Sequence, residues 1–112
     1  SYTKRVIYKN DDGHNPCHIT ISPDEKWIAA DMFNSNEPDE NNCYRSGILL
    51  IEAATGKSKV LCRTLRGAGH PRHPHPNFSP DGKKIAFTVA DGKDNCQVAY
   101  IDITGVIESW DR

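Results

Sequence analysis

The sequence contains no apolar run that approaches the roughly 20 residues needed to span a membrane, and no signal peptide opens it. It also lacks a sustained apolar period of 3.6 residues, so we expect almost no helix. Neither charge sign is in excess: 14 Lys and Arg stand against 15 Asp and Glu, spread along the chain. These absences favour a β-rich protein that binds neither nucleic acid nor a membrane surface.

Cysteine pairs of the CxxC type are absent as well, which argues against a thiolate zinc site. The four cysteines are Cys17, Cys43, Cys62 and Cys96, and their even number permits disulfides. The chain is too hydrophobic and regular for a disulfide scaffold, so we interpret them as free, partly buried thiols. The redox compartment stays open.

An internal repeat is the strongest feature that the sequence does contain. HITISPDEKWIAA, beginning at His18, runs in register and without a gap with HPNFSPDGKKIAF, beginning at His75. In each copy Pro and Asp follow Ser, which predicts a tight turn between two strands. Gly82 completes the second turn, whereas Glu25 stands in the first, where a type I turn tolerates it. Each copy therefore predicts a β-hairpin.

Further strands are expected around these hairpins. The hairpin strands should cover about 17–22 and 26–33 in the first copy, and 75–79 and 83–90 in the second. Third strands are expected at Gly47–Glu52 and Gln97–Ile103. Fourth strands are expected at Ser58–Arg63 and, more weakly, Val106–Trp110. Lys4–Lys9 has the same pattern and is expected to be a strand left over from an earlier unit.

Short antiparallel strands in fours, repeated along the chain, are typical of β-propeller blades. We therefore expect an all-β fold, a β-propeller fragment of about two four-stranded antiparallel blades. The whole chain, 1–112, would be one propeller segment, with a blade-end strand at 4–9, a blade at 17–64 and a blade at 73–110. Propellers typically need four to eight blades to close, and the chain begins with Ser rather than Met. We expect an excerpt of a longer protein, whose exposed strand edges would pair with the remaining blades or lead to self-association.

All five histidines lie in two short windows, His14 with His18 and His70 with His73 and His75. His73 and His75 are two apart on a chain that three prolines should keep extended, so their rings should point to one side. His18 occupies the position in its blade that His75 occupies in the next, so the two should be neighbours at one mouth of the propeller channel. Imidazoles presented together are suited to a transition metal ion.

Other interpretations of these residues stay open. A His-x-His pair is common by chance, and a histidine before the turn could cap a strand or pack on Trp27. His14 lies in a turn-rich connection and is expected to stay outside the site. Arg72 could neutralise a substrate carboxylate, although strand alternation points it away from His73.

The hairpin HPNFSPDGKKIAFTVADG resembles the repeat of the periplasmic Tol-system propeller and of prolyl oligopeptidases. His-Pro-His-Pro running into the blade motif, with Cys17-His18 before the preceding motif, resembles the C-terminal part of oligogalacturonate lyases. The resemblance covers about Pro16 to Ile103.

The second resemblance implies a divalent metal ion, Mn²⁺, held by three His and one Gln. His73 and His75 match the His-Pro-His pair, and His18 matches the ligand of the preceding blade. The family's Gln precedes the pair by three residues, where this chain has His70; that departure preserves a fourth ligand as imidazole or marks a relative with another metal or substrate. The family's base and its substrate arginine come from earlier blades, so the isolated chain should be inactive.

The expected function is thus metal-dependent β-elimination on short oligogalacturonides, with the oligogalacturonide as partner. One alternative is a non-catalytic Tol-type propeller that binds protein or peptide; another is the gating propeller of a peptidase. Neither alternative uses the histidines. The resemblance implies a bacterial protein. Both a cytoplasmic and a periplasmic location stay open.

Overall fold

The computed structural model describes residues 2–68, 72–92 and 95–111, and its regular secondary structure is almost entirely β-strand. A four-stranded sheet, the first sheet, has the order β1 (Pro16–Ile21), β2 (Trp27–Met32), β3 (Tyr44–Glu52) and β4 (Ser58–Arg66). A three-stranded sheet, the second sheet, has the order β5 (Asn77–Phe78), β6 (Lys84–Ala90) and β7 (Cys96–Asp102). Every neighbouring pair is antiparallel. The expected all-β fold with blade-like sheets is confirmed.

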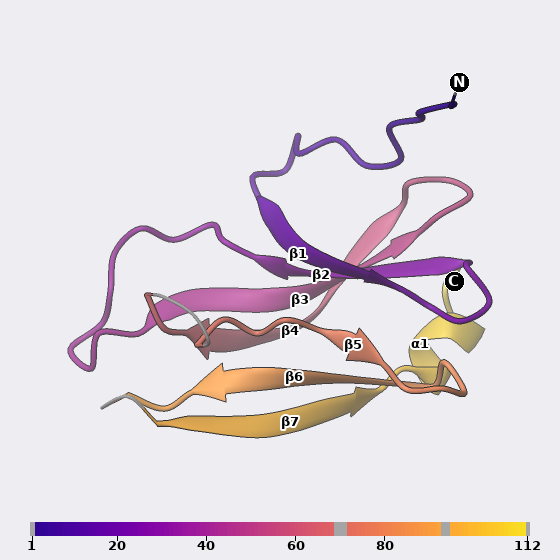
Figure 1. Cartoon of the computed structure of the whole chain (residues 1–112). Helices are drawn as coiled ribbons and strands as arrows, with labels where there is room; N and C mark the ends of the chain where they lie inside the picture. The colour runs from indigo at the N-terminus through magenta and orange to yellow at the C-terminus, as the bar shows by residue number, and fades with distance from the viewer. Residues whose placement is uncertain (1, 69–71, 93–94, 112) are drawn as a thin grey trace.

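The two sheets lie face to face, with the first sheet above the second in Figure 1. The core between them is apolar and includes eight buried side chains: Trp27, Ala29, Ile48, Leu50, Ile85, Phe87, Ile103 and Trp110. A smaller cluster of Met32, Leu49 and Ile51 lies on the outer face of the first sheet, against Ile7 and Tyr8. The central strands of the first sheet are therefore buried on both faces, as their continuous apolar pattern requires.

The two Ser-Pro-Asp turns are built by the same hydrogen bonds. In the first turn the N–H of Glu25 donates to the carbonyl of Ser22 at 2.9 Å. The Ser22 hydroxyl donates to Asp24 at 2.6 Å and accepts the N–H of Trp27 at 3.0 Å. The second turn repeats the three bonds at the same distances, through Ser79, Asp81, Gly82 and Lys84. The predicted turns at Ser22–Glu25 and Ser79–Gly82 are confirmed, and the Ser and Asp of the motif are explained.

Glu25 has a side chain at the turn position where its counterpart Gly82 has none. Both have positive φ, 62° for Glu25 and 73° for Gly82, and a side chain is strained there. Glu25→Gly should therefore raise the free energy of unfolding by about 0.5–1 kcal/mol in urea denaturation. Gly82→Glu should lower it by a similar amount. A loss of stability in Glu25→Gly would contradict the strain argument.

Two expected strands are not formed. Residues 2–10 contain no strand, because no neighbouring strand pairs with them in the part of the chain that the structure describes. The expected strand at Val106–Trp110 is wrong: Thr104–Glu108 forms a one-turn helix, α1. Asp102 accepts the N–H of Thr104 at 2.9 Å, and the turn carries Trp110 onto Trp27, with ring centroids 4.8 Å apart. Within the described residues the second sheet thus has three strands rather than the four expected.

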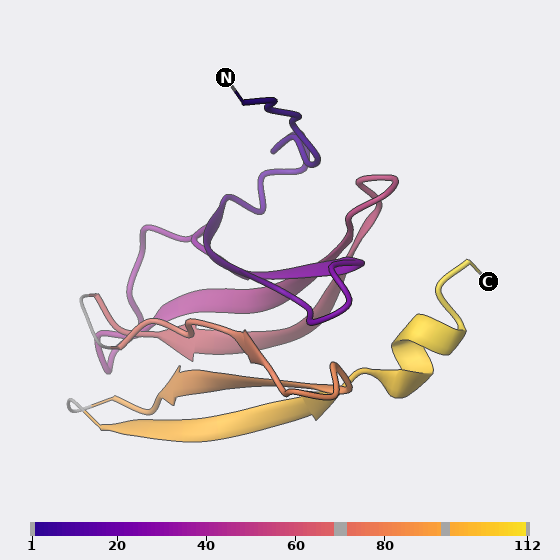
Figure 2. The ribbon, with the colours of Figure 1, turned by 45° about the vertical axis from the view of Figure 1, so that its right-hand side comes forward.

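Figure 2 shows α1 at the end of the sheet stack, on the side where the two Ser-Pro-Asp turns lie. No helix in residues 2–68, 72–92 and 95–111 has the length and apolar character needed to cross a membrane.

Candidate metal centre

Three of the predicted histidines come together at the opposite end of the two sheets from α1. His18 lies in β1, and His73 and His75 lie in the connection that leads from β4 to β5. Their ligand nitrogens all lie within 4.8 Å of one another. The His18 and His75 rings are tilted by 32° to each other at a centroid distance of 3.7 Å, and the centroid of the His73 ring lies 5.4 Å from that of His18. We call His18, His73 and His75 the histidine cluster.

The route by which the chain assembles the cluster differs from the expected one. His75 has φ of 46°, so the backbone there is left-handed rather than extended, and β5 begins only at Asn77. This conformation costs about 1–3 kcal/mol and needs support from its surroundings. Part of that support comes from Pro74, whose carbonyl accepts the N–H of Thr88 in β6 at 2.8 Å. The bend keeps the His73 and His75 rings nearly parallel, 6.2 Å apart.

A fully buried carboxylate, Asp31 at the end of β2, organises the cluster. Its Oδ1 accepts the backbone N–H of His18 at 2.8 Å, and its Oδ2 lies 2.8 Å from Nδ1 of His18. The same Oδ2 accepts the backbone N–H of His75 at 3.1 Å. A carboxylate on Nδ1 leaves Nε2 of His18 as the nitrogen that could bind a metal, an arrangement found behind many metal-binding histidines.

The prediction from sequence missed Asp31, although the sequence held a signal. Asp31 is a charged residue inside the otherwise apolar strand Trp27–Met32, and the repeat places Thr88 at the corresponding position of β6. A carboxylate in a buried strand, with no Lys or Arg next to it in the sequence, is a candidate hydrogen-bond partner for a histidine.

Aromatic and cationic side chains form one wall of the cluster. The Phe33 ring meets His73 edge to face at 4.8 Å and His18 at 5.7 Å. The buried guanidinium of Arg66 lies over Phe33 at 4.2 Å and over Tyr44 at 4.5 Å, and donates to the carbonyl of Ser35 at 3.1 Å. This packing fixes Phe33 and thereby limits the rotation of the two rings that it touches.

The remaining predicted residues lie elsewhere. His14 contacts Asp12, with Nε2 3.4 Å from a carboxylate oxygen, and is not part of the cluster. Arg72 packs against Gly67, whose missing side chain leaves room for it. His70, the fourth predicted ligand, lies outside the described residues.

The donor set fits a divalent transition metal. Two nitrogens bound to one ion at about 2.1 Å can be no more than about 4.2 Å apart, whereas those of the cluster lie within 4.8 Å of one another, so any pair beyond about 4.2 Å would have to move closer to share one ion. Imidazole suits zinc, copper, iron and nickel as well as the expected manganese. Cys17, His18 and Asp31 form a second possible group. Partial burial and, second, the Asp31 carboxylate raise the pKa of the Cys17 thiol, which weakens it as a thiolate ligand.

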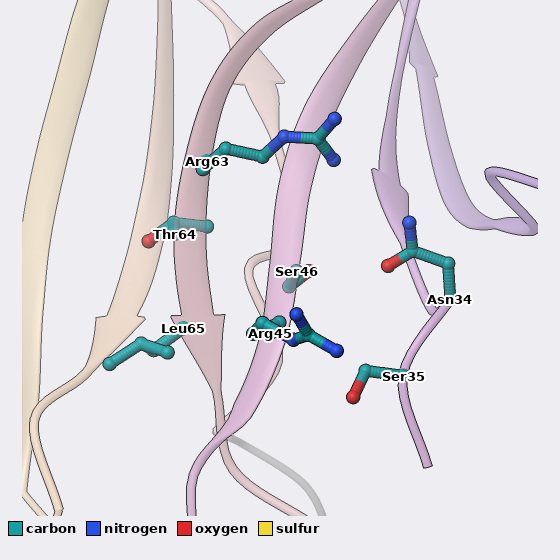
Figure 3. Close-up of a pocket in the computed structure, with 7 residues that line it drawn as sticks. All are labelled: Asn34, Ser35, Arg45, Ser46, Arg63, Thr64 and Leu65. Atoms are coloured by element: carbon teal, nitrogen blue, oxygen red, sulfur yellow. The ribbon is translucent and has the colours of Figure 1, made fainter. Parts of the chain in front are cut away.

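A separate hollow of about 630 Å³ lies on the first sheet, and none of the described residues that line it is a histidine. Figure 3 shows Arg63 of β4 and Arg45 of β3 among its lining residues, with Asn34 and Ser35 on the loop that follows β2. Because Arg63 pairs with Gly47 and Arg45 with Leu65, the two arginines are diagonal neighbours on one face. Two guanidinium groups on one face favour an anion, so this hollow is chemically distinct from the histidine cluster.

No protein-family model matches the chain, and no curated protein matches it. The resemblance to oligogalacturonate lyases therefore continues to depend on the histidine and blade motifs alone.

Proposed function

We propose that the chain is the C-terminal part of a metal-dependent oligogalacturonate lyase, and that the histidine cluster holds the divalent ion. The observation that carries the proposal is the convergence of His18, His73 and His75, with ligand nitrogens within 4.8 Å, on a buried Asp31. His70 is the proposed fourth ligand, and Mn²⁺ is the proposed ion on resemblance alone.

The reaction is β-elimination on short α-1,4-linked galacturonides. The C5 proton of a uronate is weakly acidic, because the neighbouring carboxylate is already ionised and resists further negative charge. When bound, a divalent ion would supply the positive charge that stabilises the added charge on that carboxylate. Loss of the C5 proton to a base and departure of the C4 oxygen give an unsaturated sugar.

This chain's own residues have a holding role in the proposal. His18, His73 and His75 hold the ion, Asp31 fixes the orientation of His18 and the backbone of His75, and Phe33 restricts ring rotation. The base and the substrate arginine are assigned to residues outside this chain, and Arg72 is a secondary candidate for contact with a substrate carboxylate.

The full-length protein should convert oligogalacturonides to products with the ultraviolet absorbance of a conjugated double bond. Chelators should abolish this absorbance increase, and Mn²⁺ should restore it. The isolated 112-residue chain should show no turnover. Cleavage that withstands complete metal removal would overturn the proposal, and turnover by the isolated chain would place the base within it.

A further inference from the structure

The outer face of the second sheet carries apolar residues that the repeat predicts to be buried. Val98 is 82% exposed and Tyr100 is 66% exposed, and both lie on this face with the exposed Ala86. Their counterparts in the first sheet, by repeat and strand pairing, are Ile48, Leu50 and Ala29. All three counterparts are fully buried in the core between the sheets. The face of the first sheet that packs against the second sheet therefore has an exposed counterpart, the outer face of the second sheet.

The outer face of the first sheet carries the complementary half of the same contact. Ile28, Ala30, Leu49 and Ile51 occupy the positions that Ile85, Phe87, Ala99 and Ile101 occupy on the inner face of the second sheet. On this face Ile21 of β1 is 51% exposed. Its counterpart in the repeat, Phe78 of β5, packs against the core between the sheets. A second copy of the contact between the two sheets would bury Ile21 in the same way.

The N-terminal segment, residues 4–9, lies over this outer face on the side away from the second sheet (Figures 1 and 2). Arg5 donates to the carbonyl of Ala53 at 3.0 Å, and Gly56, at φ of 78°, has no Cβ that would clash with the carbonyl of Ile7. Ile7 and Tyr8 pack against β2 and β3, much as β4 of the first sheet packs against β6 of the second. The segment thus occupies the place of a fourth strand without belonging to a sheet.

The second sheet has room for such a fourth strand beside its edge strand β7. Within the described residues β7 pairs only with β6, whereas its counterpart β3 pairs with both β2 and β4. An unpaired edge with an apolar face beside it is a template for another strand.

We propose that copies of this chain stack head to tail, with the outer face of the first sheet of one copy on the outer face of the second sheet of the next. Residues 4–9 of the first copy then pair with β7 of the next as its fourth strand. The contact is heterologous, so repetition gives a ring or an open chain of copies. A formal net charge of −1 leaves little repulsion to oppose it.

Light scattering of the 112-residue chain over a range of concentrations, with a chelator present, tests the proposal independently of any metal. The expected mass is a multiple of 12.5 kDa. Tyr100→Lys should raise the concentration of half-dissociation at least about tenfold, because it places a charge in the contact. Gln97→Lys, on the same strand but directed to the other face, should leave it unchanged.

The strand pairing is tested by proline. In an extended segment the backbone N–H groups of Val6 and Lys9 point to opposite sides, so one of the two should donate a hydrogen bond to β7. Replacing both residues by proline removes that donor. This double variant should be monomeric, and the control with alanine at both positions should associate. A 12.5 kDa monomer at all concentrations would overturn the proposal, as would association that neither Tyr100→Lys nor the proline pair weakens.

Discussion

Replacing His75 by Ala should abolish the binding of divalent metal, measured by isothermal titration calorimetry on the purified chain. His75 contributes one of three imidazoles whose nitrogens lie within 4.8 Å of one another, and its ring centroid lies 3.7 Å from that of His18. The loss should exceed the 10–100-fold that is typical when an outer partner of a ligand is removed. The unaltered chain should bind one ion.

His14→Ala is the matched control for this prediction. His14 contacts Asp12 rather than the histidine cluster, so its removal should leave the affinity unchanged. Because His75 has positive φ, His75→Asn provides a second variant, with a residue that tolerates this conformation, and it should lose binding as His75→Ala does. Equal losses in His75→Ala and His14→Ala would show that the cluster is not the metal site.

Asp31→Asn should lower the affinity for metal by about 10–100-fold. The amide oxygen can still accept the N–H of His18 in the place of Oδ1, but the NH₂ group would then take the place of Oδ2, which faces both Nδ1 of His18 and the N–H of His75. His18 would lose its fixed orientation. The free energy of unfolding without metal should also fall, by about 1–3 kcal/mol, because a buried donor is left without an acceptor.

Thr88→Ala controls for position, since Thr88 is the counterpart of Asp31 in β6 and keeps its backbone bond to Pro74. It should leave metal affinity unchanged and cost less than about 1 kcal/mol of stability. A fall in the stability of Asp31→Asn with no change in its metal affinity would limit Asp31 to a structural role. Urea denaturation and calorimetry on the same preparations separate the two effects.

The features that the sequence predicted correctly are those that local chemistry or the repeat determines. The Ser-Pro-Asp turns need only residues within each turn, and both formed as expected. The closeness of His18 and His75 followed from their equal positions in two repeats, and their ring centroids lie 3.7 Å apart.

The features that were missed depend on contacts from elsewhere in the fold. The left-handed His75 is supported by Asp31, which comes from another strand, so proline alone did not keep this stretch extended. The C-terminal residues form α1 rather than a strand, because Trp110 packs on Trp27 of the first repeat. Asp31 was missed because its role comes from its burial and from its bonds to two residues distant in sequence, which a single sequence does not display.

The contact between Asp31 and the backbone of His75 has a consequence for how the chain unfolds. Apolar packing between two sheets has no preferred direction and would allow one sheet to slide on the other. Here a directional polar bond holds one end of the contact, and the Trp27–Trp110 pair holds the other end. The repeats should therefore melt in a single cooperative transition, and any ligand of the histidine cluster should raise the melting temperature of both sheets together.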